Sequence, residues 1–272
     1  MIGGLLPLTA SASSPWLPFA GQWDSSISAT FEEADDFWRG TESRALPAGK
    51  AEQFSTHLVL GYGLTDALAL DLRVGYTGTK YGGQTIEGLD DTEIGLRYAL
   101  LNEDAFDAPS WLPSAAIRIA GVLEGTYEIN QSASPVSPGN GASGGDIGLI
   151  VGKRFHAIGA GAVAGINHRW RNEDVPSAWS YHAGIYKTLP GNLTVSVSVS
   201  GLSATNGPDI GEGRAIPPFL SIVAEEWQIG EVGLHWQPNE TGPSVSLSAA
   251  QSIDGRNTTD RSILRFGVGW KF

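Results

Sequence analysis

The stretch Ile263–Phe272, ILRFGVGWKF, decides the fold class of this chain. Every second residue from Leu264 to Phe272 is apolar or aromatic, and the residues between them are an arginine, two glycines and a lysine. A period of two residues is that of a β-strand whose two faces differ. Because the apolar face closes on an aromatic residue, the stretch predicts a terminal strand that turns this face towards lipid.

The same alternation recurs along the chain from Gly21 onward. Leu68 to Thr77, Glu93 to Leu100 and Leu193 to Ser200 each alternate apolar residues with small or polar ones. About twelve such segments can be placed, including the terminal one, and helical periodicity is almost lacking. No run approaches the roughly 18 apolar residues of a transmembrane helix. The sequence therefore predicts an all-β protein with an even number of strands.

The composition of the polar face indicates which of the two faces of the sheet points inward. The polar face consists of Gly, Ser, Ala and Thr with charges of both signs, whereas a soluble sheet collects long polar side chains on its solvent face. Small residues and paired charges suit the lumen of a narrow barrel, so we predict an antiparallel transmembrane β-barrel. The predicted pore-lining residues are Asp71, Arg73, Glu93, Arg97, Arg118, Glu124, Arg154, Arg261 and Arg265.

Five of these charges form the predicted constriction. Glu93 and Arg97 lie about 13 Å apart by strand rise, so they cannot pair with each other, but pairing across strands with Arg73 or Arg118 is possible. Arg265 completes the set. A constriction of this kind selects solutes. The alternative interpretation is a structural network that neutralises charges in a crowded interior.

The connections between segments alternate in length. Tight links are expected at Gly63–Asp66, 154–158, 189–192 and 238–242. Longer polar links are expected at about 34–51, 78–90, 128–144, 171–177 and 203–219. Short periplasmic turns and longer extracellular loops are typical of outer-membrane barrels. The segment 102–113 breaks the pattern, because it is long yet falls on the predicted short side.

Aromatic residues gather near the predicted strand ends, as the interfacial girdles of such barrels require. The alternative is the aromatic core of a soluble sandwich. The residues concerned are Trp23, Phe31, Phe54, Tyr62, Tyr76, Tyr98, Phe155, Trp170, Trp179, Trp236, Trp270 and Phe272.

Composition narrows the function classes. The net charge of -12 argues against a nucleic-acid surface, and the chain has no cysteine for a disulfide or a thiolate site. Nothing in the sequence calls for a cofactor, a metal or a catalytic residue. The histidines at 57, 156, 168, 182 and 235 leave open an envelope lipid hydrolase, and the acidic pairs at 32–33, 35–36 and 90–91 leave open a Ca²⁺ site, with solvated loop charge as the simpler interpretation.

The chain divides into two parts. Residues 1–12, MIGGLLPLTASA, resemble the distal half of a signal peptide or form an apolar N-terminal arm, and residues 13–272 are expected to be a single outer-membrane barrel domain. Phe272 is the expected signal for the barrel assembly machinery.

Three stretches resemble the transporter-like outer-membrane barrels of the meta-pathway phenol-degradation (MetA) family. They are Gly63–Asp66, Asp90–Tyr98, and Gly145–Leu149 running on to Phe155. The resemblance implies a monomeric barrel of about twelve strands in the outer membrane, in contact with lipid and lipopolysaccharide, that admits small aromatic or hydrophobic molecules. A barrel with a plugged lumen and a structural or surface-recognition role is the alternative.

Overall fold

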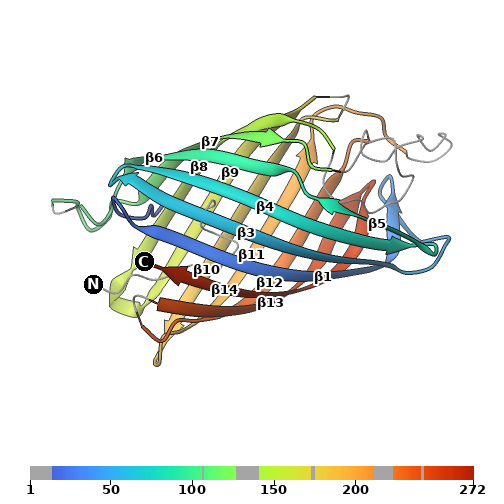
Figure 1. Cartoon of the computed structure of the whole chain (residues 1–272). Coiled ribbons are helices and arrows are strands. Elements are labelled where there is room, and N and C mark those ends of the chain that lie inside the picture. The colour runs from blue at the N-terminus through green and yellow to red at the C-terminus, as the bar shows by residue number, and fades with distance from the viewer. Residues whose placement is uncertain (1–13, 106, 127–140, 173–174, 211–222, 240–241) are drawn as a thin grey trace.

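The structure is a computed structural model that describes residues 14–105, 107–126, 141–172, 175–210, 223–239 and 242–272. Its strands form one antiparallel sheet that closes on itself as a barrel (Figure 1). Twelve strands make the wall. They are β1 (Trp23–Arg39), β3 (Ala51–Thr65), β4 (Leu68–Tyr81), β6 (Thr92–Leu101), β7 (Ser114–Leu123), β8 (Gly144–Phe155), β9 (Ala160–Arg171), β10 (Ala178–Leu189), β11 (Leu193–Ala204), β12 (Glu226–Trp236), β13 (Gly242–Arg256) and β14 (Thr259–Lys271).

The terminal stretch closes the barrel as the alternation predicted. Strand β14 pairs with β13 on one side and with β1 on the other, in a register that runs from Asp24 opposite Lys271 to Phe37 opposite Thr259. Two short strands, β2 (Glu42–Ala45) and β5 (Gln84–Leu89), extend β1 and β4 beyond the wall. Every other wall strand pairs with its neighbours along the chain, so the wall has no open edge.

The distribution of side chains is the reverse of that in a soluble protein. Large apolar residues such as Ile27, Leu58 and Ile119 are exposed on the outer face, while the largest fully buried side chain among the described residues is Arg97. Exposing so much apolar surface to water costs about 25 cal/mol per Å². That cost disappears when the outer face meets lipid, as it does in membrane barrels.

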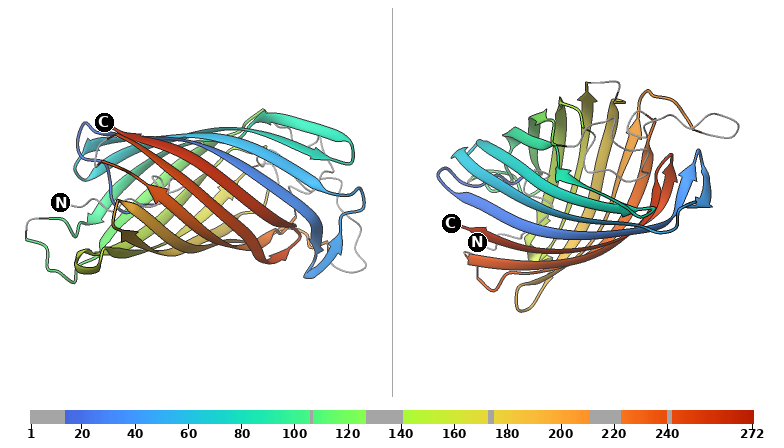
Figure 2. Two further views of the ribbon diagram at one scale, coloured as in Figure 1. Left: turned by 90° about the horizontal axis from the view of Figure 1, so that it is seen from below. Right: turned by 45° about the vertical axis from the view of Figure 1, so that its right-hand side comes forward.

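The two ends of the barrel differ, and the C-terminus lies at the same end as the start of β1 (Figures 1 and 2). We call this end, where β3–β4, β8–β9 and β10–β11 are joined by short links, the turn end, and the opposite end the loop end. By the general pattern the turn end is periplasmic. The segment 102–113 lies at the turn end as an enlarged link, since β6 ends at Leu101 and β7 begins at Ser114. At the loop end, β13 and β14 are joined by two residues only, with Asn257 in the left-handed region.

The aromatic residues form a belt near each end. Near the turn end, the rings of Trp23 and Tyr62 face each other at 4.6 Å between centroids on β1 and β3. Near the loop end, Phe31 and Phe54 do the same at 4.9 Å on the same two strands. The position of these pairs at both ends of one strand pair is the arrangement expected of interfacial girdles.

Two expectations fall on residues outside this description. The segment 1–12, read as a signal-peptide remnant or arm, lies outside the described residues, as does most of the predicted loop 128–144. Among the residues that are described, no helix is long and apolar enough to cross a membrane.

Candidate functional site: the charged lumen

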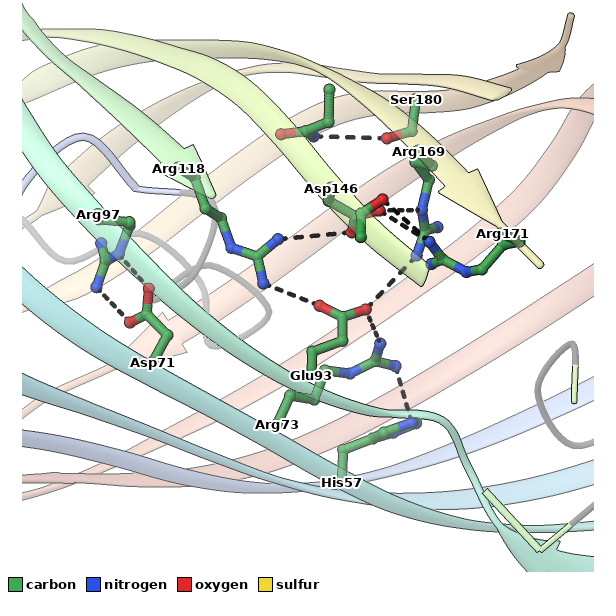
Figure 3. Close-up of polar contacts among 12 residues, drawn as sticks. His57, Asp71, Arg73, Glu93, Arg97, Arg118, Asp146, Arg169, Arg171 and Ser180 are labelled. Carbon is green, nitrogen blue, oxygen red and sulfur yellow. Dashed lines mark hydrogen bonds and ion pairs between the residues drawn. The ribbon is translucent and has the colours of Figure 1, made fainter. Parts of the chain in front are cut away.

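The barrel encloses a cavity of about 610 Å³, lined mostly by inward-facing residues of every wall strand except β13. One part of its lining is a network of ion pairs centred on Glu93 of β6 (Figure 3). Glu93 lies 3.3 Å from Arg73 Nη1 of β4, 2.9 Å from Arg118 Nη2 of β7 and 3.5 Å from Arg169 Nη2 of β9. The predicted pairing of Glu93 with Arg73 and Arg118 is confirmed.

A second carboxylate, Asp146 of β8, joins this network from the next strand (Figure 3). Its oxygens lie 3.7 Å from Arg118 Nη1, 3.3 Å from Arg169 Nε and 3.1 Å from Arg171 Nη1. The register of the sheet explains the arrangement, because Arg73 pairs with Glu93 and Asp146 pairs with Arg169 across adjacent strands. We call these six residues, Arg73, Glu93, Arg118, Asp146, Arg169 and Arg171, the arginine network.

His57 and Asp90 extend the arginine network towards the loop end. His57 Nε2 lies 2.8 Å from Asp90 Oδ2 and 2.9 Å from Arg73 Nη2, so this nitrogen either donates to the carboxylate or accepts from the guanidinium. Burial by itself raises the pKa of the Asp90 carboxyl, but the hydrogen bond to His57 and the nearby Arg73 outweigh it and hold that pKa below its ordinary value. Gly75 leaves the room for this contact, since a Cβ there would lie 2.5 Å from His57 Cδ2.

A separate pair lies nearer the turn end. Arg97 of β6 donates from Nε and Nη2 to the two oxygens of Asp71 of β4, at 2.7 and 2.8 Å. Its Nη1 donates to the backbone oxygen of Ser14 at 2.8 Å. The side chain of Arg97 is 1% exposed, so this guanidinium joins the wall to the N-terminal segment.

Residues 14–19, which we call the N-terminal segment, enter the lumen at the turn end. Trp16 Nε1 donates to Glu103 Oε1 at 2.8 Å, and the Arg154 guanidinium lies 4.3 Å from the Trp16 ring centroid. A Cβ on the inward-facing Gly152 would come within 2.8 Å of Pro15 and Trp16. The segment therefore occupies space that an open barrel of this size would leave to solvent.

Glu103 fixes this segment from the enlarged link between β6 and β7. Besides the hydrogen bond from Trp16, Glu103 accepts one from the Arg154 backbone N–H, at 3.1 Å to Oε2. It also forms an ion pair with Lys153 Nζ, at 3.0 Å. Burial raises the pKa of Glu103, but these donors act more strongly and lower that pKa below its ordinary value. A charged Glu103 is thus the form that holds the N-terminal segment.

The rest of the cavity wall carries hydroxyl groups and isolated ion pairs. On β14, Arg265 pairs with Glu231 of β12, and Arg261 lies 3.4 Å from Glu32 of β1. The hydroxyl groups that line the cavity belong to Ser28, Thr30, Ser55, Thr77, Ser180, Ser196, Ser198 and Ser200. The lumen therefore has an ionic side, on β4 to β9, and a side on β10 and β11 that is rich in serine.

The predicted pore-lining residues fall into five groups. Arg73, Glu93 and Arg118 meet in the arginine network, and Asp71 and Arg97 form the buried pair. Arg154 lies at the turn end against Trp16 and pairs with Asp104, while Arg261 and Arg265 lie on β14. Glu124 is exposed in the loop after β7. Phe272 exchanges two backbone hydrogen bonds with Trp23, at 2.9 and 3.1 Å.

Sequence reasoning missed half of the arginine network. Asp146, Arg169 and Arg171 were not among the predicted pore-lining residues, although the last two alternate with the outward-facing Trp170 in the expected period. That alternation could have identified both arginines. The contribution of Asp90 could not be found this way, because it lies outside the strands and reaches His57 from the turn before β6.

Comparisons with known proteins support the fold. The structure is similar to an outer membrane channel from Pseudomonas putida F1, with a TM-score of 0.71 and 12% identity over 97% of this chain and 98% of that one. The fold is that of an outer-membrane β-barrel. It is also similar to the KdgM porin (TM-score 0.52, 10% identity, 91% and 99% of the two chains) and to the translocator domain of the autotransporter NalP from Neisseria meningitidis (0.52, 11%, 94% and 90%).

No protein-family model and no curated protein sequence matches the chain. The outer-membrane barrel fold expected from the sequence agrees with these structural neighbours. Membership of the MetA family stays a prediction.

Proposed function

We propose that this protein is a passive channel for small molecules in the bacterial outer membrane. The observation that carries the proposal is a closed barrel with an apolar outer face and a cavity lined by charged and hydroxyl side chains. Such a lumen replaces part of the hydration of a polar solute, while the wall shields that solute from lipid. The similarity in fold to outer-membrane channels supports the same function.

We extend the proposal to aromatic and other partly apolar compounds. Val59 and Val163 add apolar surface to the lining of the same cavity, beside the ionic side. A solute with a ring and a polar group can contact both kinds of surface. The chain is proposed to act as a monomer surrounded by lipid and lipopolysaccharide, because its own β1–β14 pairing closes the wall.

The test is conductance. The refolded protein is inserted into planar bilayers and into liposomes, and insertion is verified by protease protection. Discrete current steps, together with liposome swelling that slows as solute size increases, are the expected result. Heat-denatured protein serves as the control. Silence from inserted, folded protein would contradict the channel and favour a barrel that the N-terminal segment keeps plugged.

A further inference from the structure

We propose that the lumen binds small carboxylates at the guanidinium groups of Arg73 and Arg169. This inference rests on the proposed channel function and names the class of solute that the channel prefers. It depends on which charged groups of the arginine network are exposed to the cavity, and not on the net charge of the lumen.

The arginines of the network are exposed to the cavity while the carboxylates are enclosed. The side chains of Arg73 and Arg169 are 40% and 29% exposed, whereas those of Glu93 and Asp146 are 11% and 6% exposed. Each carboxylate is surrounded by three guanidinium groups (Figure 3). A solute that approaches the arginine network therefore meets N–H donors before it can reach a carboxylate oxygen of Glu93 or Asp146.

The arginine network contains more hydrogen-bond donors than acceptors. A guanidinium carries five N–H donors, and an ionised carboxylate offers about four acceptor positions. Four arginines share Glu93 and Asp146, so donors exceed acceptors well over twofold even before the serine hydroxyls are added. Arg73 uses both terminal nitrogens, on Glu93 and His57, and Arg169 uses Nη2 and Nε, on Glu93 and Asp146, so that Arg73 Nε and Arg169 Nη1 are the donors left for a ligand among the contacts of the described residues. A carboxylate supplies two acceptors in the geometry that a guanidinium fork prefers.

The cavity as a whole is close to electroneutral. Its lining includes five arginines and six acidic residues, so no strong field of one sign extends through it. We therefore expect modest selectivity between K⁺ and Cl⁻ but clear binding of carboxylates by contact. A cation would need open carboxylate oxygens, and those of Glu93 and Asp146 are already shared among the arginines. Three further carboxylates of the lining have partners of their own, since Glu32 pairs with Arg261, Glu231 with Arg265 and Asp90 with His57.

The experiment compares three probes that share one ring and differ in charge: benzoate, benzyl alcohol and benzylammonium. Binding to the folded protein in detergent is measured by calorimetry, and interruption of single-channel current is measured in planar bilayers. We expect benzoate to bind and to interrupt the current, and the other two probes to do so at least tenfold more weakly.

Three variants and a control locate the site. Arg73→Gln and Arg169→Gln should each weaken benzoate binding about tenfold or more, since a charge-assisted hydrogen bond is lost. Glu93→Gln should strengthen it, because a competing acceptor charge is removed. Arg44→Gln changes the net charge equally but lies on β2, in an exposed pair with Glu42, and should leave benzoate binding unchanged. Circular dichroism confirms that each variant is folded.

The possible outcomes separate this inference from the channel proposal. Equal binding of the three probes, or benzoate binding that is indifferent to Arg73 and Arg169, would overturn the carboxylate site even if the channel conducts. Benzoate binding that depends on both arginines without any conductance would support the site and contradict the channel.

Discussion

Arg97 and Asp71 form a two-pronged ion pair across β4 and β6, with nitrogen–oxygen distances of 2.7 and 2.8 Å and side chains that are 1% and 3% exposed. Breaking a buried pair by removing one partner leaves the other charge uncompensated, which costs about 3–5 kcal/mol. We therefore expect Arg97→Gln to lower the free energy of unfolding by that amount. The measurement is urea unfolding in lipid vesicles, followed by tryptophan fluorescence.

The control for this pair is the double variant Asp71→Asn, Arg97→Gln, which removes both charges. It should be more stable than Arg97→Gln alone. If the double variant is as unstable as the single one, the cost arises from lost packing or from the contact with Ser14, and not from the ion pair.

Trp16 and the enlarged link between β6 and β7 should control how far the turn end is open. Trp16→Ala removes the hydrogen bond to Glu103 and the ring against Arg154. We expect larger or more frequent current steps in planar bilayers. The matched control is Trp111→Ala, because Trp111 lies in the same link and is exposed. Identical conductance in the two variants would mean that the N-terminal segment does not limit the current.

Acidification should weaken the contact between Glu103 and the N-terminal segment. The pKa of Glu103 lies below its ordinary value of 4.5, so the contact stabilises the folded arrangement fully above that ordinary value. The stabilisation is lost as the pH falls through the lowered pKa. We expect conductance to rise in this acidic range in the wild type, and to be nearly independent of pH there in Glu103→Gln. A parallel rise in both proteins would show that another group is responsible.

The contact between His57 and Asp90 depends on a glycine. In Gly75→Ala the new Cβ would lie 2.5 Å from His57 Cδ2 and 2.6 Å from Asp90 Oδ2, so the side chains must move. We expect a loss of about 1–3 kcal/mol in stability, as for other overpacked sites. Gly121→Ala is the control, since a Cβ there has no neighbour within 4 Å and should cost little. Equal urea midpoints for the two variants would contradict the crowding at Gly75.

Substitution of Phe272 should affect assembly of the barrel in cells but not the stability of the folded protein. The side chain of Phe272 is exposed, and its two hydrogen bonds to Trp23 involve only the backbone. Phe272→Ala should change the urea midpoint of the refolded protein by no more than an ordinary surface substitution, within about 0.5 kcal/mol. If the residue is the expected assembly signal, the amount of folded barrel in the outer membrane of living cells should fall several-fold. Unchanged amounts in cells would remove that role.

The alternation of residues predicted much of the fold because a strand has the same period wherever it lies. The inward positions of Arg73, Glu93 and Arg118 followed from that period, and their opposite charges indicated that Glu93 could pair with the two arginines. The pairing of Arg97 did not follow, since it depends on the register between β4 and β6, which places Asp71 within reach. Register is set by turn geometry and by the packing of both faces, and one strand alone does not reveal it.

By itself, the sequence determined that this chain is a membrane barrel. In lipid the backbone groups of each strand must be hydrogen-bonded within a closed sheet, and the alternation places small and polar residues inside while apolar side chains face lipid. Only the tertiary structure decided which charges meet, which of them face the cavity, and where the N-terminal segment lies. Those features join residues far apart in the chain, such as Ser14 and Arg97 or Glu93 and Arg169, and they arise only when closure of β14 on β1 brings all the inward faces into one lumen.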